Sequence, residues 1–202
     1  MAIIVPPAPL PLRNVSWRAP FPAQVNRSGW TGRSKIVGLP GATVWTVSGS
    51  FVTIIGADRG KPWRGFFTAL HGQLHKFRVR GGEDLQTTAA NPTVRAGAND
   101  GVTVPLAGLP ANKTVLISGS LMTVPLPSGH ERMVCLTADL VSNGLGQGTA
   151  TFGPELGEVP ATGAVVEIGR PWSLVRQTNK APGWDVEPGQ KYIFALDAEE
   201  AL

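Results

Sequence analysis

The chain has 202 residues, 42% of them hydrophobic and 16% charged, and a formal net charge of +4. This length is enough for one large or two small domains with a packed core, and the low charge content excludes a long disordered tail. The single cysteine excludes an intramolecular disulfide, and no stretch comes near the roughly 20 apolar residues of a membrane span. We therefore expect a folded chain that is made in the cytoplasm and has no membrane partner.

Charge is divided unevenly along the chain. Residues 1–80 contain eleven Lys/Arg and one acid, giving +10, whereas residues 81–202 contain seven Lys/Arg and thirteen acids, giving −6. Such asymmetry fits a nucleic-acid-binding face, or a protomer whose basic part meets the acidic part of a neighbouring copy. Because the chain has no Lys/Arg run and many predicted strands, we favour assembly and keep nucleic-acid binding as the alternative.

The N-terminal region is predicted to be an extended arm followed by strands. Residues 1–11 contain four prolines, which favour an extended segment lying along a surface. Residues 12–55 read as strands, and apolar residues alternate clearly within 43–55. The apolar side of that segment holds Trp45, Val47, Phe51 and Ile55. Gly49 lies on the same side and predicts a bulge.

Residues 62–77 are the one good helix candidate, because apolar residues recur there at three- and four-residue spacing. These residues are Trp63, Phe66, Phe67, Leu70, Leu74 and Phe77. Pro62 suits the first position of a helix. Gly65 and Gly72 each weaken a helix by about 1 kcal/mol relative to Ala, so the aromatic stripe should pack against a sheet.

A second unit is predicted after the helix. Residues 81–112 are polar and glycine-rich, which indicates a boundary or long loop, with a short strand near Val102 and Val104. Further strands are expected at 114–124, 132–141, 148–152, 163–168 and 172–177, separated by clear turn sequences. Short strands at this spacing suit a small barrel or a sandwich.

The last predicted strand, 192–198, is expected to return to the N-terminal sheet. The fold class is therefore mainly β with one helix. We predict one domain formed by residues 1–80 together with 181–202, and an inserted β-domain, barrel or sandwich, formed by residues 81–180. Chain termini commonly lie close together, which makes such insertions tolerable.

One histidine pair has the spacing of metal ligands. His71 and His75 are four apart on the predicted helix, which could place two imidazoles on one metal. No acid lies between them, and the only other histidine of the chain is His130. We interpret the pair as a polar helix edge and expect no metal site.

The region around residues 120–139 contains the residue types of catalytic triads. They are Ser120, Ser128, His130, Glu131 and Asp139. Their order and spacing match no nucleophile elbow, and Ser128-Gly129-His130 is typical of a turn. Cys135 lies among apolar neighbours and is interpreted as a small buried hydrophobe. We therefore expect no catalytic residues and no cofactor, and do not expect an enzyme.

Aromatic and basic residues are mixed in the N-terminal region. Trp and Arg dominate the hot spots of protein–protein interfaces, and the same mixture could stack on and neutralise a single nucleic-acid strand. We favour a protein interface, with acids near the C-terminus meeting bases of residues 1–80. The candidate interface residues are Trp17, Arg18, Trp30, Arg33, Asp197, Glu199 and Glu200.

The C-terminal half resembles the distal tail protein group of tailed bacteriophages. The passages that carry this resemblance are TADLVSNGLGQGTATFGPEL, PATGAVV at 160–166, GWDVEPG at 183–189 with the strand after it, and WRGFF followed by FRV at 77–79. The resemblance covers the larger part of the chain, and its motifs are turns and strands without invariant functional residues.

The resemblance implies a function in a virion. Such proteins have an N-terminal β-sandwich related to tail-tube folds, and many carry a second β-domain. Six copies form a ring that joins the tail tube to the tail tip, and DNA passes through its centre. The implied partners are further copies of the chain, the tail tube protein and the hub or tip proteins. The alternative is a nucleic-acid-binding or carbohydrate-binding β-domain, with Trp172 or Trp184 stacking on a sugar.

Overall fold

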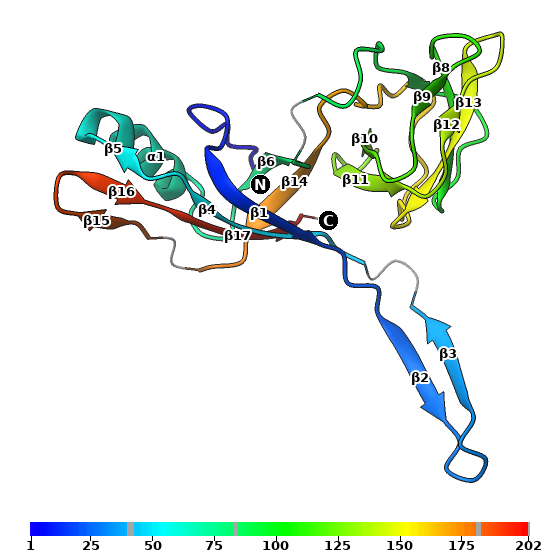
Figure 1. Ribbon diagram of the computed structural model, residues 1–202, viewed down its shortest axis with the longest axis horizontal. Coiled ribbons are helices and arrows are strands. Elements are labelled where there is room, and N and C mark those ends of the chain that lie inside the picture. Colours follow the sequence, from blue (N-terminus) through cyan, green and yellow to red (C-terminus); the bar gives the residue numbers. More distant parts are fainter. Residues whose placement is uncertain (40–42, 83–84, 181–182, 202) are drawn as a thin grey trace.

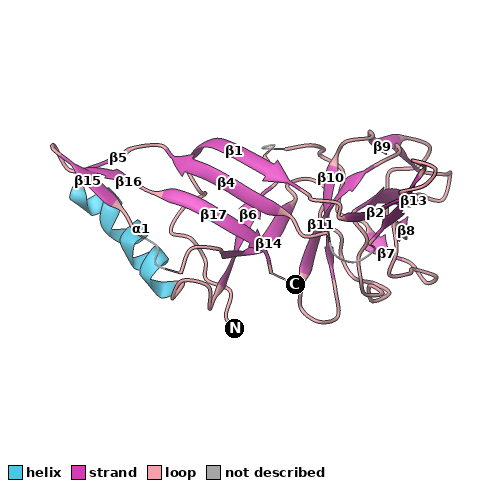
Figure 2. Cartoon of the chain, turned by 90° about the horizontal axis from the view of Figure 1, so that it is seen from below, coloured by secondary structure: helices cyan, strands magenta, loops and turns pink. Residues whose placement is uncertain are grey.

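The computed structural model describes residues 1–39, 43–82, 85–180 and 183–201. The fold is mainly β with one helix, which confirms the predicted fold class. The strands of the described residues form several antiparallel sheets and no closed barrel. Two bodies lie side by side along the long axis (Figures 1 and 2), and a two-stranded hairpin extends away from them (Figure 1).

The first body is built on a five-stranded sheet of order β1-β4-β17-β14-β6. These strands are β1 (Leu12–Arg18), β4 (Thr46–Phe51), β17 (Ala195–Glu200), β14 (Trp172–Gln177) and β6 (Lys76–Arg80). The last strand, β17, lies between β4 and β14. The prediction that the C-terminal strand returns to the N-terminal sheet is therefore confirmed.

The bulge predicted at Gly49 lies instead in the partner strand. The register of β1 against β4 shifts between Leu12 and Asn14. A Cβ at position 49 would lie 2.6 Å from the backbone oxygen of Asn14, so the close approach of the two strands requires glycine there. The expected strand 43–55 is also divided into β4 and the two-residue β5 (Ile54–Ile55), and Ile55 is exposed.

The helix, α1 (Ala57–Ala69), starts five residues before its predicted start and ends before 70. Pro62 lies inside the helix and not at its first position. The end was predicted too late because His71 and Gly72 have left-handed φ values of 47° and 65°, which no helix continues through. The chain then extends, so Phe77 belongs to strand β6 and Leu74 is exposed.

The aromatic stripe of α1 packs on the first sheet, as predicted. Phe67 stacks on Phe194 with ring centroids 5.2 Å apart, and Phe51 meets Trp63 edge-on at 5.2 Å. The core of this body contains Val47, Phe51, Trp63, Phe66, Phe67, Leu70, Phe77, Val79, Val175, Tyr192, Phe194, Leu196 and Ala198.

A small three-stranded sheet of order β15-β16-β5 lies against α1 at the end of this body (Figures 1 and 2). It adds β15 (Asp185–Glu187) and β16 (Lys191–Ile193) to β5. A Cβ at Gly60 of α1 would lie 2.6 Å from the Tyr192 ring, so this glycine allows β16 to approach the helix closely.

The second body has its own sheet and core. Its five-stranded sheet, of order β10-β11-β13-β8-β7, contains β10 (Leu121–Pro125), β11 (Glu131–Leu136), β13 (Gln147–Gly153), β8 (Thr103–Ala107) and β7 (Thr93–Val94). A two-stranded sheet adds β9 (Thr114–Leu116) and β12 (Leu140–Val141). A separate cluster of buried residues, which includes Leu106, Met122, Phe152 and Ile168, fills this body.

Four expected strands of the second unit differ in the structure. Segment 114–124 is divided into β9 and β10, and segment 132–141 is divided into β11 and β12. Segment 163–168 forms only isolated bridges, from Val165 to Thr93 and from Glu167 to Thr123. Strand 172–177 is β14, which pairs with β6 and β17 of the first sheet. The second sheet and its core thus end before residue 170, earlier than the boundary at 180 that the sequence suggested. The division of the chain into two domains stays a prediction.

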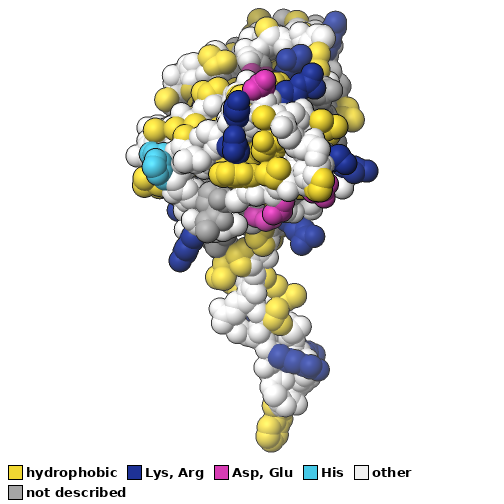
Figure 3. Space-filling model, turned by 90° about the vertical axis from the view of Figure 1, so that its left-hand side faces the viewer, with side chains coloured by type: hydrophobic (Ala, Val, Ile, Leu, Met, Phe, Trp, Pro, Cys, Tyr) yellow, Lys and Arg dark blue, Asp and Glu magenta, His cyan; other side chains and the backbone are white. Residues whose placement is uncertain are grey.

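The hairpin that leaves the two bodies consists of β2 (Ala23–Arg27) and β3 (Ser34–Gly38). We call residues 23–39 the arm. Every residue of the arm is exposed. Figure 3 shows it extending from the rest of the molecule, with hydrophobic and basic side chains along it.

Candidate functional site

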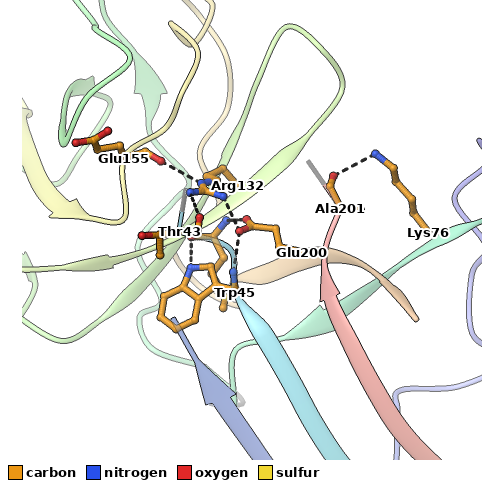
Figure 4. A network of polar contacts seen from close by, with 8 residues as sticks. Thr43, Trp45, Lys76, Arg132, Glu155, Glu200 and Ala201 are labelled. Atoms are coloured by element: carbon orange, nitrogen blue, oxygen red, sulfur yellow. Dashed lines mark hydrogen bonds and ion pairs between the residues drawn. The ribbon is translucent and has the colours of Figure 1, made fainter. Parts of the chain in front are cut away.

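Two regions of the molecule are candidates for a functional role: a buried polar junction between the two bodies, and the arm. At the junction, Arg132 on β11 and Glu200 on β17 form an ion pair with an N–O distance of 2.6 Å (Figure 4). Each side chain is only 2% exposed. The pair therefore joins the second sheet to the C-terminal strand of the first.

Backbone groups complete the junction. The guanidinium of Arg132 also donates to the carbonyl oxygens of Thr43 (2.8 Å) and Glu155 (3.1 Å). The carboxylate of Glu200 accepts the backbone N–H groups of Trp45 (3.2 Å) and Met133 (3.4 Å). A buried ion pair is tolerated when further hydrogen bonds satisfy its remaining donors and acceptors, as they do here.

Burial raises the pKa of the Glu200 carboxyl, while the Arg132 guanidinium and the two N–H donors oppose that rise. The guanidinium itself stays protonated, because arginine does not lose its proton in proteins. Glu200 therefore has no exposed carboxylate to offer a neighbouring copy. The expectation that it meets a base of residues 1–80 is corrected: its partner is Arg132 of the same chain.

Two further hydrogen bonds support the junction. The indole Nε1 of Trp45 donates to the carbonyl oxygen of Met133 (2.7 Å). The ammonium of Lys76 on β6 donates to the carbonyl oxygen of Ala201 (3.1 Å), as Figure 4 shows. Burial, with Arg176 nearby, lowers the pKa of Lys76. The Arg132–Glu200 pair and the Trp45 indole thus connect the two bodies, while Lys76 supports the C-terminal end of the first sheet.

The two indoles considered for sugar stacking each lie beside an arginine. The guanidinium of Arg78 lies 5.0 Å from the centre of the Trp172 ring, and the Trp172 Nε1 donates to Glu131 (2.6 Å). Trp184 is 39% exposed, with Arg64 at 5.7 Å from its ring centre. An open aromatic platform would leave a ring face free, so this geometry does not favour the carbohydrate-binding alternative.

The histidine pair that was interpreted as a polar helix edge lies beyond the end of the helix. His71 and His75 follow the end of α1, with ring centroids 5.7 Å apart. Nδ1 of His75 accepts the backbone N–H of Ala2 (3.2 Å), which fixes the N-terminal segment beside β6. Among residues 1–39, 43–82, 85–180 and 183–201, no group of three or more His, Cys, Asp or Glu side chains is placed to hold a metal ion.

The polar residues that resemble triad components have separate structural contacts. The Ser128 N–H binds Glu158, the His130 ring lies 3.3 Å from Nζ of Lys76, and Glu131 accepts Nε of Arg78 (2.6 Å). Asp139 accepts the backbone N–H of Ser118 (2.7 Å). These contacts hold turns and strands in place.

Cys135 is partly buried, whereas the sequence suggested full burial. Its thiol lies 3.5 Å from the carbonyl oxygen of Gly119, and burial raises the pKa of the thiol. The side chain is therefore held in its protonated form, which is a weak nucleophile.

The remaining candidate interface residues lie in different surroundings. Trp17 is half-buried and meets Trp45 edge-on at 6.2 Å, so it belongs to the fold. Glu199 pairs with Arg176 at 2.8 Å, again outside residues 1–80. Arg18 and Asp197 are exposed.

The arm holds the two most accessible candidates, Trp30 and Arg33. Trp30 is 98% exposed at the hairpin end. Val25 and Ile36 lie opposite each other on one face of the hairpin and are 61% and 66% exposed. In the described part of the chain, no ion pair involves the basic arm residues Arg27, Arg33 and Lys35.

Sequence reasoning missed two features. Arg132 was not singled out, although a cation inside the apolar strand ERMVCL could have indicated a buried pair. The Val25–Ile36 pair was also missed, although Val25 lies between two polar residues in a short strand pattern.

No family model matches the chain, and a search of curated proteins finds no match. In the part of the chain that the structure describes, no helix has the length and apolar content needed to cross a bilayer.

Proposed function

We propose that this protein is a structural component of a bacteriophage tail. In this proposal its copies assemble into a closed ring that joins the tail tube to the tail tip, and DNA passes through the ring. The observation that carries the proposal is the arm, whose side chains are all exposed and include several large hydrophobic ones.

An arm of this kind is poorly suited to a monomer. An isolated two-stranded hairpin is marginally stable in water, and its unpaired edges are templates for pairing with other chains. Along the arm and its base, Phe21, Val25, Trp30, Ile36, Val37 and Leu39 are between 41% and 98% exposed. Exposed apolar patches of this sort mark protein interaction sites.

The opposite charges of the arm and of strand β15 support self-assembly. The arm carries Arg27, Arg33 and Lys35 and no acid. The acidic strand β15 lies at the opposite end of the molecule (Figure 1). Complementary surfaces at opposite ends of one chain produce a head-to-tail contact, which closes into a ring or extends as a filament.

The placement in a tail follows from the family resemblance, which implies a ring of six copies. A mainly β body with one helix, beside a second β body, fits the layout of those proteins. A conducting channel with a strongly basic wall would bind DNA and slow its passage. In this proposal the arm's bases therefore face neighbouring copies and not the channel.

Electron microscopy of the purified protein tests the proposal. Rings with a central channel, and the same protein located by labelling between tail tube and tip of assembled particles, are expected. Particles that contain the protein only elsewhere, or a preparation without rings at any concentration, would contradict it.

Nucleic-acid binding is the second candidate, favoured by the almost fully exposed Trp30 close to Arg27 and Arg33. Filter binding over a salt series separates the two functions, because phosphate contacts give an affinity that falls steeply with salt. Salt-dependent binding to single-stranded DNA that Trp30→Ala abolishes would support this candidate over assembly.

A further inference from the structure

We infer that β3 of the arm pairs antiparallel with β15 of the next copy, with Ile36 opposite Val186. The contact extends the three-stranded sheet β15-β16-β5 into a five-stranded sheet shared by two copies. This inference rests on the proposed self-assembly and specifies which surfaces meet.

Both strands have a free edge. In the described residues β3 pairs only with β2, and β15 pairs only with β16. All three residues of β15 are exposed, as are all five of β3. Addition of a strand to an exposed sheet edge is an established mode of protein recognition.

The direction of the backbone groups determines which residue of β3 can pair. Ser28 N–H binds the Arg33 carbonyl, and Leu39 N–H binds the Pro22 carbonyl. Residues alternate in an antiparallel ladder, so residues 33, 35, 37 and 39 turn their backbone groups towards β2. Ile36 therefore directs its N–H and C=O to the open edge.

The same reasoning applies to β15. The Gly56 N–H donates to the Gln190 carbonyl oxygen. The backbone N–H and C=O groups of residues 190 and 192 therefore point towards β5, and those of 191 and 193 point towards β15. Asp185 and Glu187 then face β16, and Val186 alone directs its N–H and C=O outwards. Ile36 and Val186 can thus exchange two hydrogen bonds as a directly opposed pair.

The side chains fit in this register. Lys35 lies opposite Glu187, an attractive pair, and Ile36 lies beside Val186, which is 55% exposed. Since side chains on one face follow the ladder, one row across the shared sheet is apolar. This row is Val25, Ile36, Val186, Tyr192 and Ile54.

The second row also matches. It consists of Asn26, Lys35, Glu187, Lys191 and Ile55, so the acid lies between two cations. In this register Val37 lies opposite Asp185. A shift by one residue would place Ile36 opposite Asp185 or Glu187, whose backbone groups already pair with β16, so the hydrogen bonds of Ile36 would be lost. Pro188 follows β15 and has no N–H to donate, which limits the pairing to a short segment.

The strands cannot meet within one chain. The arm and the β15-β16 hairpin lie at opposite ends of the molecule, as Figures 1 and 2 both show. A second copy is therefore the occupant that satisfies both edges, and repetition of the contact generates the assembly.

A cysteine pair tests the register directly. In the full chain carrying Cys135→Ala, Ile36→Cys with Val186→Cys should give a ladder of disulfide-linked oligomers after mild oxidation, because opposed residues lie about 5.5 Å apart. The control is Val25→Cys with Val186→Cys, which places the first cysteine on the same face but one strand further away. It should give far less cross-linking.

A charge exchange gives an independent readout. Lys35→Glu or Glu187→Lys alone should raise the concentration needed for assembly about tenfold, because like charges then lie directly opposite each other. The double variant should recover most of that loss. Recovery supports the pairing, since an unrelated role of either residue would give additive losses.

The outcomes separate this inference from the proposed function. The wild-type chain could assemble while the double-cysteine variant gives no cross-link and the double charge variant shows no recovery. That result would overturn the pairing and leave ring assembly standing. A chain that stays monomeric under all conditions would overturn both.

Discussion

At the junction, Arg132 and Glu200 are each 2% exposed, and hydrogen bonds from the same chain satisfy both side chains. Along the arm every residue is exposed, and its bases have no ion pair within the described residues. The junction fixes how the two bodies sit against each other. The arm leaves apolar and charged groups open at a distance from them. The contrast separates residues that maintain the protomer from residues available to a partner.

Breaking the junction should have the largest effect on stability. Glu200→Ala leaves the Arg132 guanidinium buried without its partner, which typically costs about 3–5 kcal/mol. Urea unfolding followed by tryptophan fluorescence measures the loss. The control is Glu199→Ala, whose more exposed pair with Arg176 should contribute about 0–1 kcal/mol.

The double variant Arg132→Met with Glu200→Met sharpens this test. It removes both charges together and should be markedly more stable than Glu200→Ala, because no unpaired charge remains buried. A double variant as unstable as the single one would mean that packing, and not charge pairing, holds the junction.

Replacing two glycines of α1 by alanine should give the next largest changes in the free energy of unfolding, and the two changes should have opposite signs. Gly60→Ala places a methyl group 2.6 Å from the Tyr192 ring and should cost about 1–3 kcal/mol through overpacking. Gly65→Ala meets nothing within 4 Å and should stabilise the helix by about 1 kcal/mol. Thermal unfolding of both variants provides the comparison.

The Gly60 variant also bears on the arm's proposed acceptor. Tyr192 lies opposite Val186 in the small sheet, so displacing its ring should disturb β15. Assembly should weaken in Gly60→Ala and stay unchanged in Gly65→Ala. Equal assembly by both variants would argue against β15 as the acceptor.

The smallest stability effect is expected on the arm. Trp30→Ala removes a side chain that is 98% exposed, so the unfolding free energy of the monomer should change by no more than about 0.5 kcal/mol. The measurement is thermal unfolding at a protein concentration too low for assembly. A loss of several kcal/mol would show that the arm supports the protomer itself.

The sequence predicted the fold class because strands and turns follow local rules. Alternation identified a strand near the C-terminus, which the structure divides into β16 and β17, and the three- and four-residue spacing located the face of α1 that Phe66 and Phe67 bury. The helix end was misplaced because Leu74 and Phe77 continue the apolar spacing beyond the left-handed residues His71 and Gly72.

The functional residues were harder to predict because burial and pairing depend on residues far apart in sequence. Glu199 and Glu200 are adjacent, yet one is half-exposed and the other buried, since neighbours in a strand face opposite sides. The partner of Glu200 is 68 positions away. The arm is exposed because the hairpin leaves the first sheet and, among the residues that the structure describes, packs on neither body. A local sequence pattern does not encode that placement.

The central claim is that copies of this chain assemble through the arm. Native mass spectrometry of the full chain and of Ile36→Glu, which places a further acid beside Asp185 and Glu187 of β15, tests it most directly. The account predicts a single closed species of six copies for the wild-type chain and a monomer for the variant. A wild-type monomer, or an unchanged assembly of the variant, would contradict it.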